Sequence, residues 1–194
     1  MEMNRYVSGL VVVLNSLCLI VVGGCSSPKV RWDKMVPDSL DVTTLHAESI
    51  SVNVMGQAPL SFLNAFDKAT TQCIENSHVF ELGEPSAATA LVLDIIVTWL
   101  EVPASMDAWP GGMEGIQREF QSQGAAVCTL AARWRLSKAD RESVLIEKEI
   151  VTSDTHDVPL FMIDGQDTAG RDATEAAVRA NIKQGLEWAA KVRW

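Results

Sequence analysis

The feature that most constrains this chain of 194 residues is an apolar run near its N-terminus. Arg5 precedes an apolar stretch over residues 7–22, and two glycines close it. A positive start, an apolar stretch and small residues at its end form the layout of a secretory leader. The alternative, a membrane-spanning helix, needs about 20 predominantly apolar residues. This run is shorter and contains Asn15, so we expect residues 1–24 to be a signal peptide that takes no part in the fold.

The residues at the end of the leader resemble a lipid-attachment motif. Val22-Gly23-Gly24-Cys25 places an aliphatic residue and two small residues before a cysteine, and this is similar to the lipobox of bacterial lipoproteins. The resemblance implies cleavage just before Cys25 and a diacylglycerol cysteine that carries a further acyl chain such as palmitate. Ser26 implies sorting to the outer membrane. The alternative is an ordinary leader with a cysteine close to its cut site.

An anchor of this kind would define both the cellular location of the protein and its domain boundaries. One acyl chain holds a protein only marginally, at about 0.8 kcal/mol per buried CH₂, whereas several chains hold it firmly. The resemblance therefore implies a protein that is bound to the outer membrane through Cys25 and faces the periplasm. Residues 25–46 contain two prolines and little periodicity, which predicts the lipidated cysteine and a flexible tether. Residues 47–194 are expected to form one α+β domain.

Charge and cysteine content exclude several classes of function. The chain has 16 Lys and Arg against 25 Asp and Glu, a net charge of −9. Nucleic-acid binding needs basic residues that neutralise phosphates, so nucleic acid is not an expected partner. Beyond the leader and Cys25, only Cys73 and Cys128 remain, too few for a four-cysteine zinc site. Both fall on the inward sides of predicted elements, where they form either a disulfide or two buried thiols.

The hydrophobic pattern predicts an α+β fold with strand–helix–meander–helix order. Alternation predicts strands, and apolar residues at 3.6-residue spacing predict helices. Expected strands cover residues 48–55, part of 77–85, 90–102, 125–136 and 144–152; expected helices cover 59–76 and 172–192. We expect an antiparallel sheet of about four to five strands with both helices packed on one face.

Two details of this pattern matter for the surface. In the strand over 90–102, alternation places Trp99 on the same face as Leu93 and Val97. In the last helix, Glu175 stands four residues before Arg179, a spacing that favours an ion pair within the helix.

The long connection over residues 103–124 is a candidate contact surface. It contains Trp109, Met113 and Phe120 among several glycines. Connections of this length inside a compact domain are usually functional or disordered. Exposed together, these apolar side chains would contact a partner or a lipid. The alternative is that they cover one edge of the core.

The sequence contains no recognisable catalytic signature. Neither a nucleophile elbow nor a zinc-protease motif, a P-loop or a dinucleotide fingerprint is present. Asp154, His156 and Asp157 form the closest cluster, which could bind a metal or transfer a proton, but such residues are more typical of a solvated loop. We therefore expect no catalytic residue, no metal, no cofactor and no enzymatic activity.

The mature chain also resembles a group of small outer-membrane lipoproteins. The residues that carry this resemblance are ISVNV followed by LSFLNAFDKATTQCIEN, then ALVLDIIV, AARWRL, VLIEKEIVTSD and the terminal helix. The layout is similar to the lipopolysaccharide-assembly lipoproteins and to the auxiliary lipoproteins of ABC-type lipid transport systems.

This second resemblance implies an accessory role in envelope biogenesis. The protein would assist lipid or lipopolysaccharide transport through a protein partner in the envelope. One departure is that the chain is acidic, with Arg133 and Arg135 as its compact basic pair, whereas a polyanionic ligand favours many basic residues. The alternative is a structural lipoprotein that scaffolds a secretion or cell-wall complex.

Overall fold

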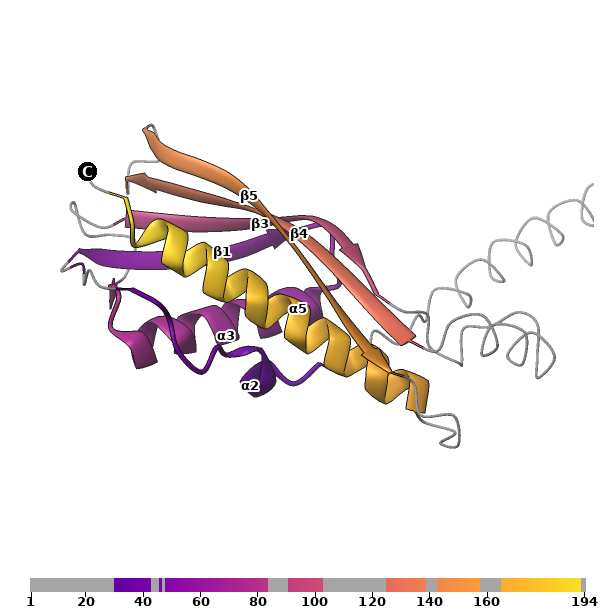
Figure 1. The fold of residues 1–194 in the computed structure, drawn as a ribbon. Helices are drawn as coiled ribbons and strands as arrows, with labels where there is room; N and C mark the ends of the chain where they lie inside the picture. Colours follow the sequence, from indigo (N-terminus) through magenta and orange to yellow (C-terminus); the bar gives the residue numbers. More distant parts are fainter. Residues whose placement is uncertain are drawn as a thin grey trace, which may run out of the picture.

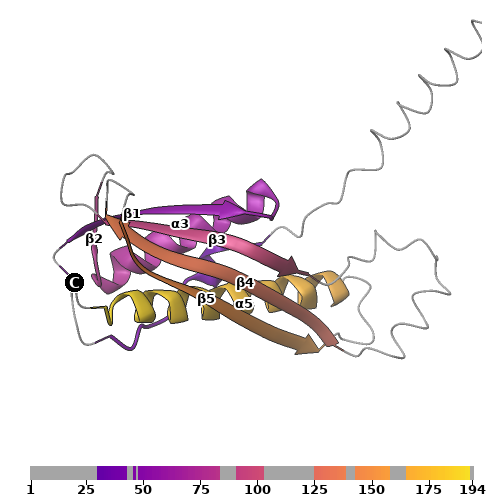
Figure 2. The ribbon, with the colours of Figure 1, turned by 90° about the horizontal axis from the view of Figure 1, so that it is seen from above.

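The fold is a curved five-stranded sheet whose inner face is covered by helices (Figures 1 and 2). The computed structural model describes residues 30–42, 46, 48–83, 91–102, 125–138, 143–157 and 165–192. The helices are α2 (Trp32–Met35), α3 (Leu60–Ser77) and α5 (Gly165–Ala189). The strands are β1 (Ser49–Gly56), β2 (Glu81–Leu82), β3 (Leu91–Glu101), β4 (Ala125–Lys138) and β5 (Val144–Asp157).

The sheet is mixed, and the predicted antiparallel sheet is wrong. The strand order is β2-β1-β3-β4-β5. β1 runs parallel to both β2 and β3, whereas β3, β4 and β5 form an antiparallel meander. The physical reason is α3, which carries the chain back across the sheet after β1. β3 therefore starts at the same end as β1, with Leu91 beside Ile50. A helical crossover of this kind joins parallel neighbours.

One core holds the helices against the sheet. β3 is central, and its first five residues are buried whichever face they point to. β4 turns every second side chain into the core, with Leu130, Ala132, Trp134 and Leu136 fully buried, and Ala131 is buried on the other face. α3 and α5 contribute the opposite layer of the same cluster, including Phe66 and Ile182. Both predicted long helices therefore pack on the same side of the sheet, and α2 is a third, unpredicted helix beside them.

Trp134 lies at the centre of this core and has a complete set of partners. Its indole N–H donates to the Asn181 side-chain oxygen at 2.8 Å, and the Asn181 amide donates to the Ile150 carbonyl at 3.0 Å. A Cβ atom on Gly185 would lie 2.3 Å from the indole ring. Gly185 is therefore required for α5 to approach β4 this closely, although glycine normally weakens a helix.

The outer face of the sheet carries exposed apolar side chains. Trp99 pairs with Ala131, which pairs with Val151, so these residues form a row across β3, β4 and β5. Trp99 is 60% exposed and Val151 is 59% exposed. The prediction that Trp99 shares a face with Leu93 and Val97 is wrong because the β3–β4 register shifts between Val97 and Trp99. An extra residue in a strand moves the following side chains to the other face.

Candidate functional site

The N-terminal segment, residues 30–42, is built into the domain. Met35 in α2 is fully buried in the main core, and Val30, Val36, Leu40 and Val42 pack against it. Residues 25–46 were expected to be a tether, yet the described part of that range is packed against α3 and α5. The signal in the sequence was the spread of apolar residues through this stretch, which follows neither a helical nor a strand period.

A row of charged side chains on α5 binds this segment. The row consists of Glu175, Arg179, Lys183 and Glu187, and we call it the ladder. A spacing of four residues places all four on one helix face. Glu175 accepts from the N–H of Arg31 at 2.8 Å, and Glu187 accepts from the N–H of Asp41 at 2.7 Å. Between them, Arg179 donates to the carbonyl of Lys34 at 2.8 Å, and Lys183 donates to the carbonyl of Ser39 at 3.0 Å.

The ladder explains why an irregular segment is stable on a helix surface. A backbone group packed against a protein surface costs free energy unless it finds a hydrogen-bond partner. Here carboxylates of α5 accept from the segment's N–H groups, and cationic side chains donate to its carbonyls. Glu175 and Arg179, predicted as an ion pair within the helix, bind the segment instead. The sequence signal was the four-residue period of charge along α5.

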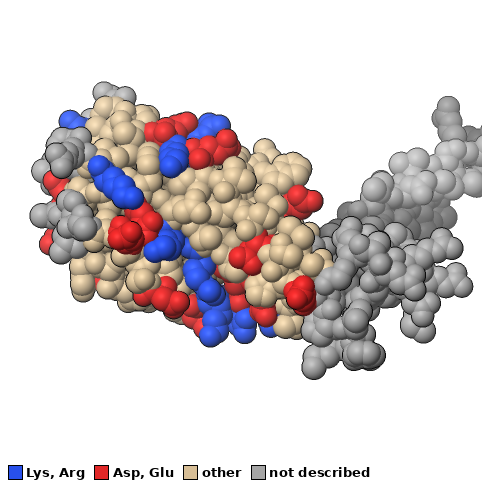
Figure 3. All heavy atoms as spheres, viewed as in Figure 1, with Lys and Arg blue, Asp and Glu red and all other residues tan. Residues whose placement is uncertain are grey.

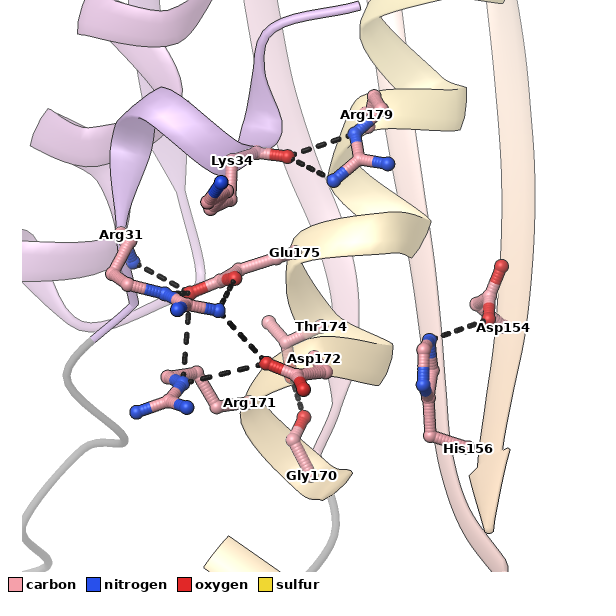
Figure 4. A network of polar contacts seen from close by, with 10 residues as sticks. All are labelled: Arg31, Lys34, Asp154, His156, Gly170, Arg171, Asp172, Thr174, Glu175 and Arg179. Atoms are coloured by element: carbon pink, nitrogen blue, oxygen red, sulfur yellow. Dashed lines mark hydrogen bonds and ion pairs between the residues drawn. The ribbon is translucent and has the colours of Figure 1, made fainter. Parts of the chain in front are cut away.

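The strongest contact of the ladder is a clamp between Arg31 and Glu175 (Figure 4). The Arg31 guanidinium donates to both oxygens of Glu175, with Nη2···Oε2 at 2.7 Å and Nε···Oε1 at 3.0 Å, and Nη2 also donates to Asp172 at 2.9 Å. The Glu175 side chain is 2% exposed, whereas that of Arg31 is 43% exposed. The hydrogen bond to Glu175 raises the pKa of Arg31 above its ordinary value. Bidentate pairs of this geometry are among the stronger polar contacts in proteins.

The far end of the ladder is fixed at the C-terminus of α5. Burial tends to raise the pKa of Glu187, but hydrogen bonds from Lys183 and from the Asp41 N–H outweigh it, so the pKa is lowered overall. Lys183 and Glu187 pair at 2.7 Å. His46 then bonds the Ala190 carbonyl through Nε2 at 2.9 Å and stacks on Phe80. The described residues before β1, 30–42 and 46, are therefore bound along most of α5.

The other predicted site residues fall into two groups. Cys25, Trp109, Met113 and Phe120 lie outside the described residues. Of the described ones, Asp154 and His156 approach to 3.4 Å on the surface near the end of β5. Within the described ranges, no group of three or more His, Cys, Asp or Glu side chains is placed to hold a metal ion. Arg133 and Arg135 both pair with the carboxylate of Glu147, at Nε···O distances of 3.5 and 2.7 Å.

The two described cysteines are free thiols in separate clusters. Cys73 belongs to the main core, whereas Cys128 packs with Ala173 and Ala177 near the start of α5. The candidate disulfide between them is therefore not formed in this structure. Burial raises the pKa of each thiol from 9.0 to about 11.

These thiols make a testable contribution to stability at high pH. Because the folded pKa is raised, unfolded thiols ionise first as pH rises from about 9, and the free energy of unfolding should fall until about pH 11. The expected loss is on the order of 2–3 kcal/mol per thiol. Urea unfolding between pH 8 and 11 would measure it, with the Cys73→Ala, Cys128→Ala double variant as control. A pH dependence equally steep in that variant would contradict this account.

Comparison with known proteins identifies the kind of fold. No protein-family model and no curated protein matches the sequence. The structure resembles a Xanthomonas campestris protein described by the family model DUF330, with a TM-score of 0.54, 11% identity and coverage of 84% of this chain and 92% of that one. It also resembles a minor lipoprotein from Acinetobacter baumannii, with a TM-score of 0.50, 9% identity and coverage of 75% and 92%. The chain has a lipoprotein-like fold.

This finding supports the coarse part of the resemblance predicted from the sequence. At 11% and 9% identity, the two likenesses show a shared fold. Among the described residues, no helix is both long and apolar enough to cross a membrane.

Proposed function

We propose that this protein is an accessory lipoprotein of the bacterial envelope, anchored in the outer membrane through acylated Cys25. It assists lipid or lipopolysaccharide transport by contact with a protein partner, without catalysing a reaction. The observation that carries the proposal is the ladder, because it fixes residues 31–41, which follow the lipobox in the sequence, to α5. The fold that is shared with a minor lipoprotein supports the same reading.

Contact with a partner is favoured over direct binding of lipopolysaccharide. On the outer face of the sheet, the compact basic pair Arg133 and Arg135 already shares the carboxylate of Glu147, so this pair is not free to bind a polyanion. Asp154 and His156 lie on the surface, and among the described residues no third His, Cys, Asp or Glu side chain is placed to bind a metal ion with them.

The anchor can be tested directly in a Gram-negative host. The full chain should incorporate an alkyne-tagged palmitate, and mass spectrometry should find the acyl groups on an N-terminal cysteine that corresponds to Cys25. The Cys25→Ser variant should lose the label and leave the membrane fraction. Label that persists in Cys25→Ser, or its absence from the unaltered chain, would refute the anchor.

The partner requires a second experiment. We expect affinity capture from detergent-solubilised membranes to recover a component of a lipid-transport system. Capture of secretion or cell-wall proteins would instead support the scaffolding alternative. Density fractionation of the membranes should place the protein with the outer membrane, and its recovery with the inner membrane would contradict that location.

A further inference from the structure

We propose that the protein lies on its membrane with the helical face down, so that α2 and the basic side chains around the Arg31–Glu175 clamp contact anionic lipid headgroups. The Arg31–Glu175 clamp holds the chain that follows the anchor on α5. The proposal rests on the acylation of Cys25 and adds to it an orientation and a lipid-contacting surface.

The first argument is the length of chain between the anchor and the clamp. Cys25 and Arg31 are six residues apart, and six extended residues span at most about 20 Å. α5 has 25 residues, so its length is about 38 Å. The acyl chains must therefore enter the bilayer within about half a helix length of Arg31. Since the clamp is on the helical side of the sheet, this is the side that the anchor holds near the membrane.

The second argument is charge. The chain as a whole carries −9, yet four cationic residues gather around the clamp: Arg31, Lys34, Arg171 and Arg179. Their acidic neighbours are Asp33, Asp172 and Glu175, and the last is buried beneath the Arg31 guanidinium. Figure 3 shows Lys and Arg side chains following one another across the face that carries α2 and α5. Near an anionic bilayer each such residue contributes about 1 kcal/mol.

A third observation places an interfacial side chain on the same surface. Trp32 in α2 is partly exposed, and the Lys68 ammonium lies 4.0 Å from the centre of its ring. Tryptophan and lysine both favour the headgroup region, because each joins an apolar body to a polar end. The opposite face of the sheet carries the exposed apolar side chains Trp99 and Val151.

The orientation can be measured with two matched labels. Asp33→Cys places a thiol on α2, and Val151→Cys places one on the outer face of β5. Cys73 and Cys128 are buried and Cys25 would be acylated, so a fluorophore would react only at the new cysteine. Each acylated full-length variant would be reconstituted into vesicles of phosphatidylcholine and phosphatidylglycerol that contain a headgroup-quenching lipid.

We expect headgroup quenching to be several-fold stronger for the label at position 33 than at position 151. Replacing Lys34 and Arg171 by Gln, or omitting phosphatidylglycerol, should reduce the ratio. Glu175→Gln should also reduce it, with circular dichroism confirming that the variant is folded. Equal quenching at both positions in acylated protein, or stronger quenching at 151, would overturn the orientation alone. A mass spectrum showing unacylated Cys25 would overturn the proposed anchor instead.

Discussion

Trp134→Ala is expected to lower the free energy of unfolding by about 3–5 kcal/mol, the usual cost of removing a large aromatic side chain from a core. Trp134 is fully buried, packs close to α5 at Gly185 and donates its indole N–H to Asn181. Its removal would leave a cavity and an amide oxygen without its donor. Urea unfolding followed by far-UV circular dichroism would measure the loss.

Trp99→Ala is the matched control, because it removes the same side chain from the neighbouring strand. Trp99 is 60% exposed on the outer face, so its loss should cost less than about 1 kcal/mol. Trp134→Phe, which keeps an aromatic ring but removes the N–H, should fall between the two. Similar losses for Trp134→Ala and Trp99→Ala would contradict the assignment of the core to the helical side.

Periodicity predicted the elements of this fold better than their arrangement. The apolar spacing of α3 and α5 and the alternation of β4 are local properties. The structure contains α3 and β4 within two residues of their predicted bounds, whereas α5 begins at Gly165, seven residues before the predicted start. The direction of β3 relative to β1 depends on the path of α3 between them, which no local pattern records. A second non-local event is the register shift after Val97, which moved Trp99 to the solvent side.

The candidate site was missed for a related reason. Charged residues four apart on a helix are usually read as pairs within that helix, because nothing in the sequence identifies a partner about 144 residues away. Met35 is buried, but a single apolar residue in a proline-containing stretch forms no helical or strand periodicity. The sequence pattern therefore did not indicate that this stretch packs on the core. Only the folded chain shows that the ladder and the N-terminal segment are complementary.

Glu175→Ala is expected to lower the free energy of unfolding by about 2 kcal/mol. Breaking a fully buried ion pair typically costs 3–5 kcal/mol, and breaking an exposed pair costs about 0–1 kcal/mol. The clamp lies between these limits, because Glu175 is buried whereas the Arg31 guanidinium is half-exposed and can return to water. The backbone N–H of Arg31 also loses its acceptor. Chemical unfolding of the full chain would give the value.

The control for this variant is Glu187→Ala, at the other end of the ladder. Glu187 also accepts a backbone hydrogen bond, from Asp41, but its side chain is more exposed than that of Glu175, so the loss should stay below about 1 kcal/mol. A double-mutant cycle between Arg31→Ala and Glu175→Ala should give a coupling of at least about 0.5 kcal/mol, as expected for residues in contact.

Hydrogen exchange would show where the ladder variants act. In Glu175→Ala the Arg31 amide should exchange faster while the amides of β4 change little, because the segment would open without the sheet. In Glu187→Ala the faster exchange should instead be at Asp41. If Glu175→Ala cost no more than Glu187→Ala and left the Arg31 amide protected, the clamp could not be what holds the N-terminal segment. The proposed orientation, with the helical face on the membrane, would then lose the contact that holds the N-terminal segment on α5, even if Cys25 were acylated.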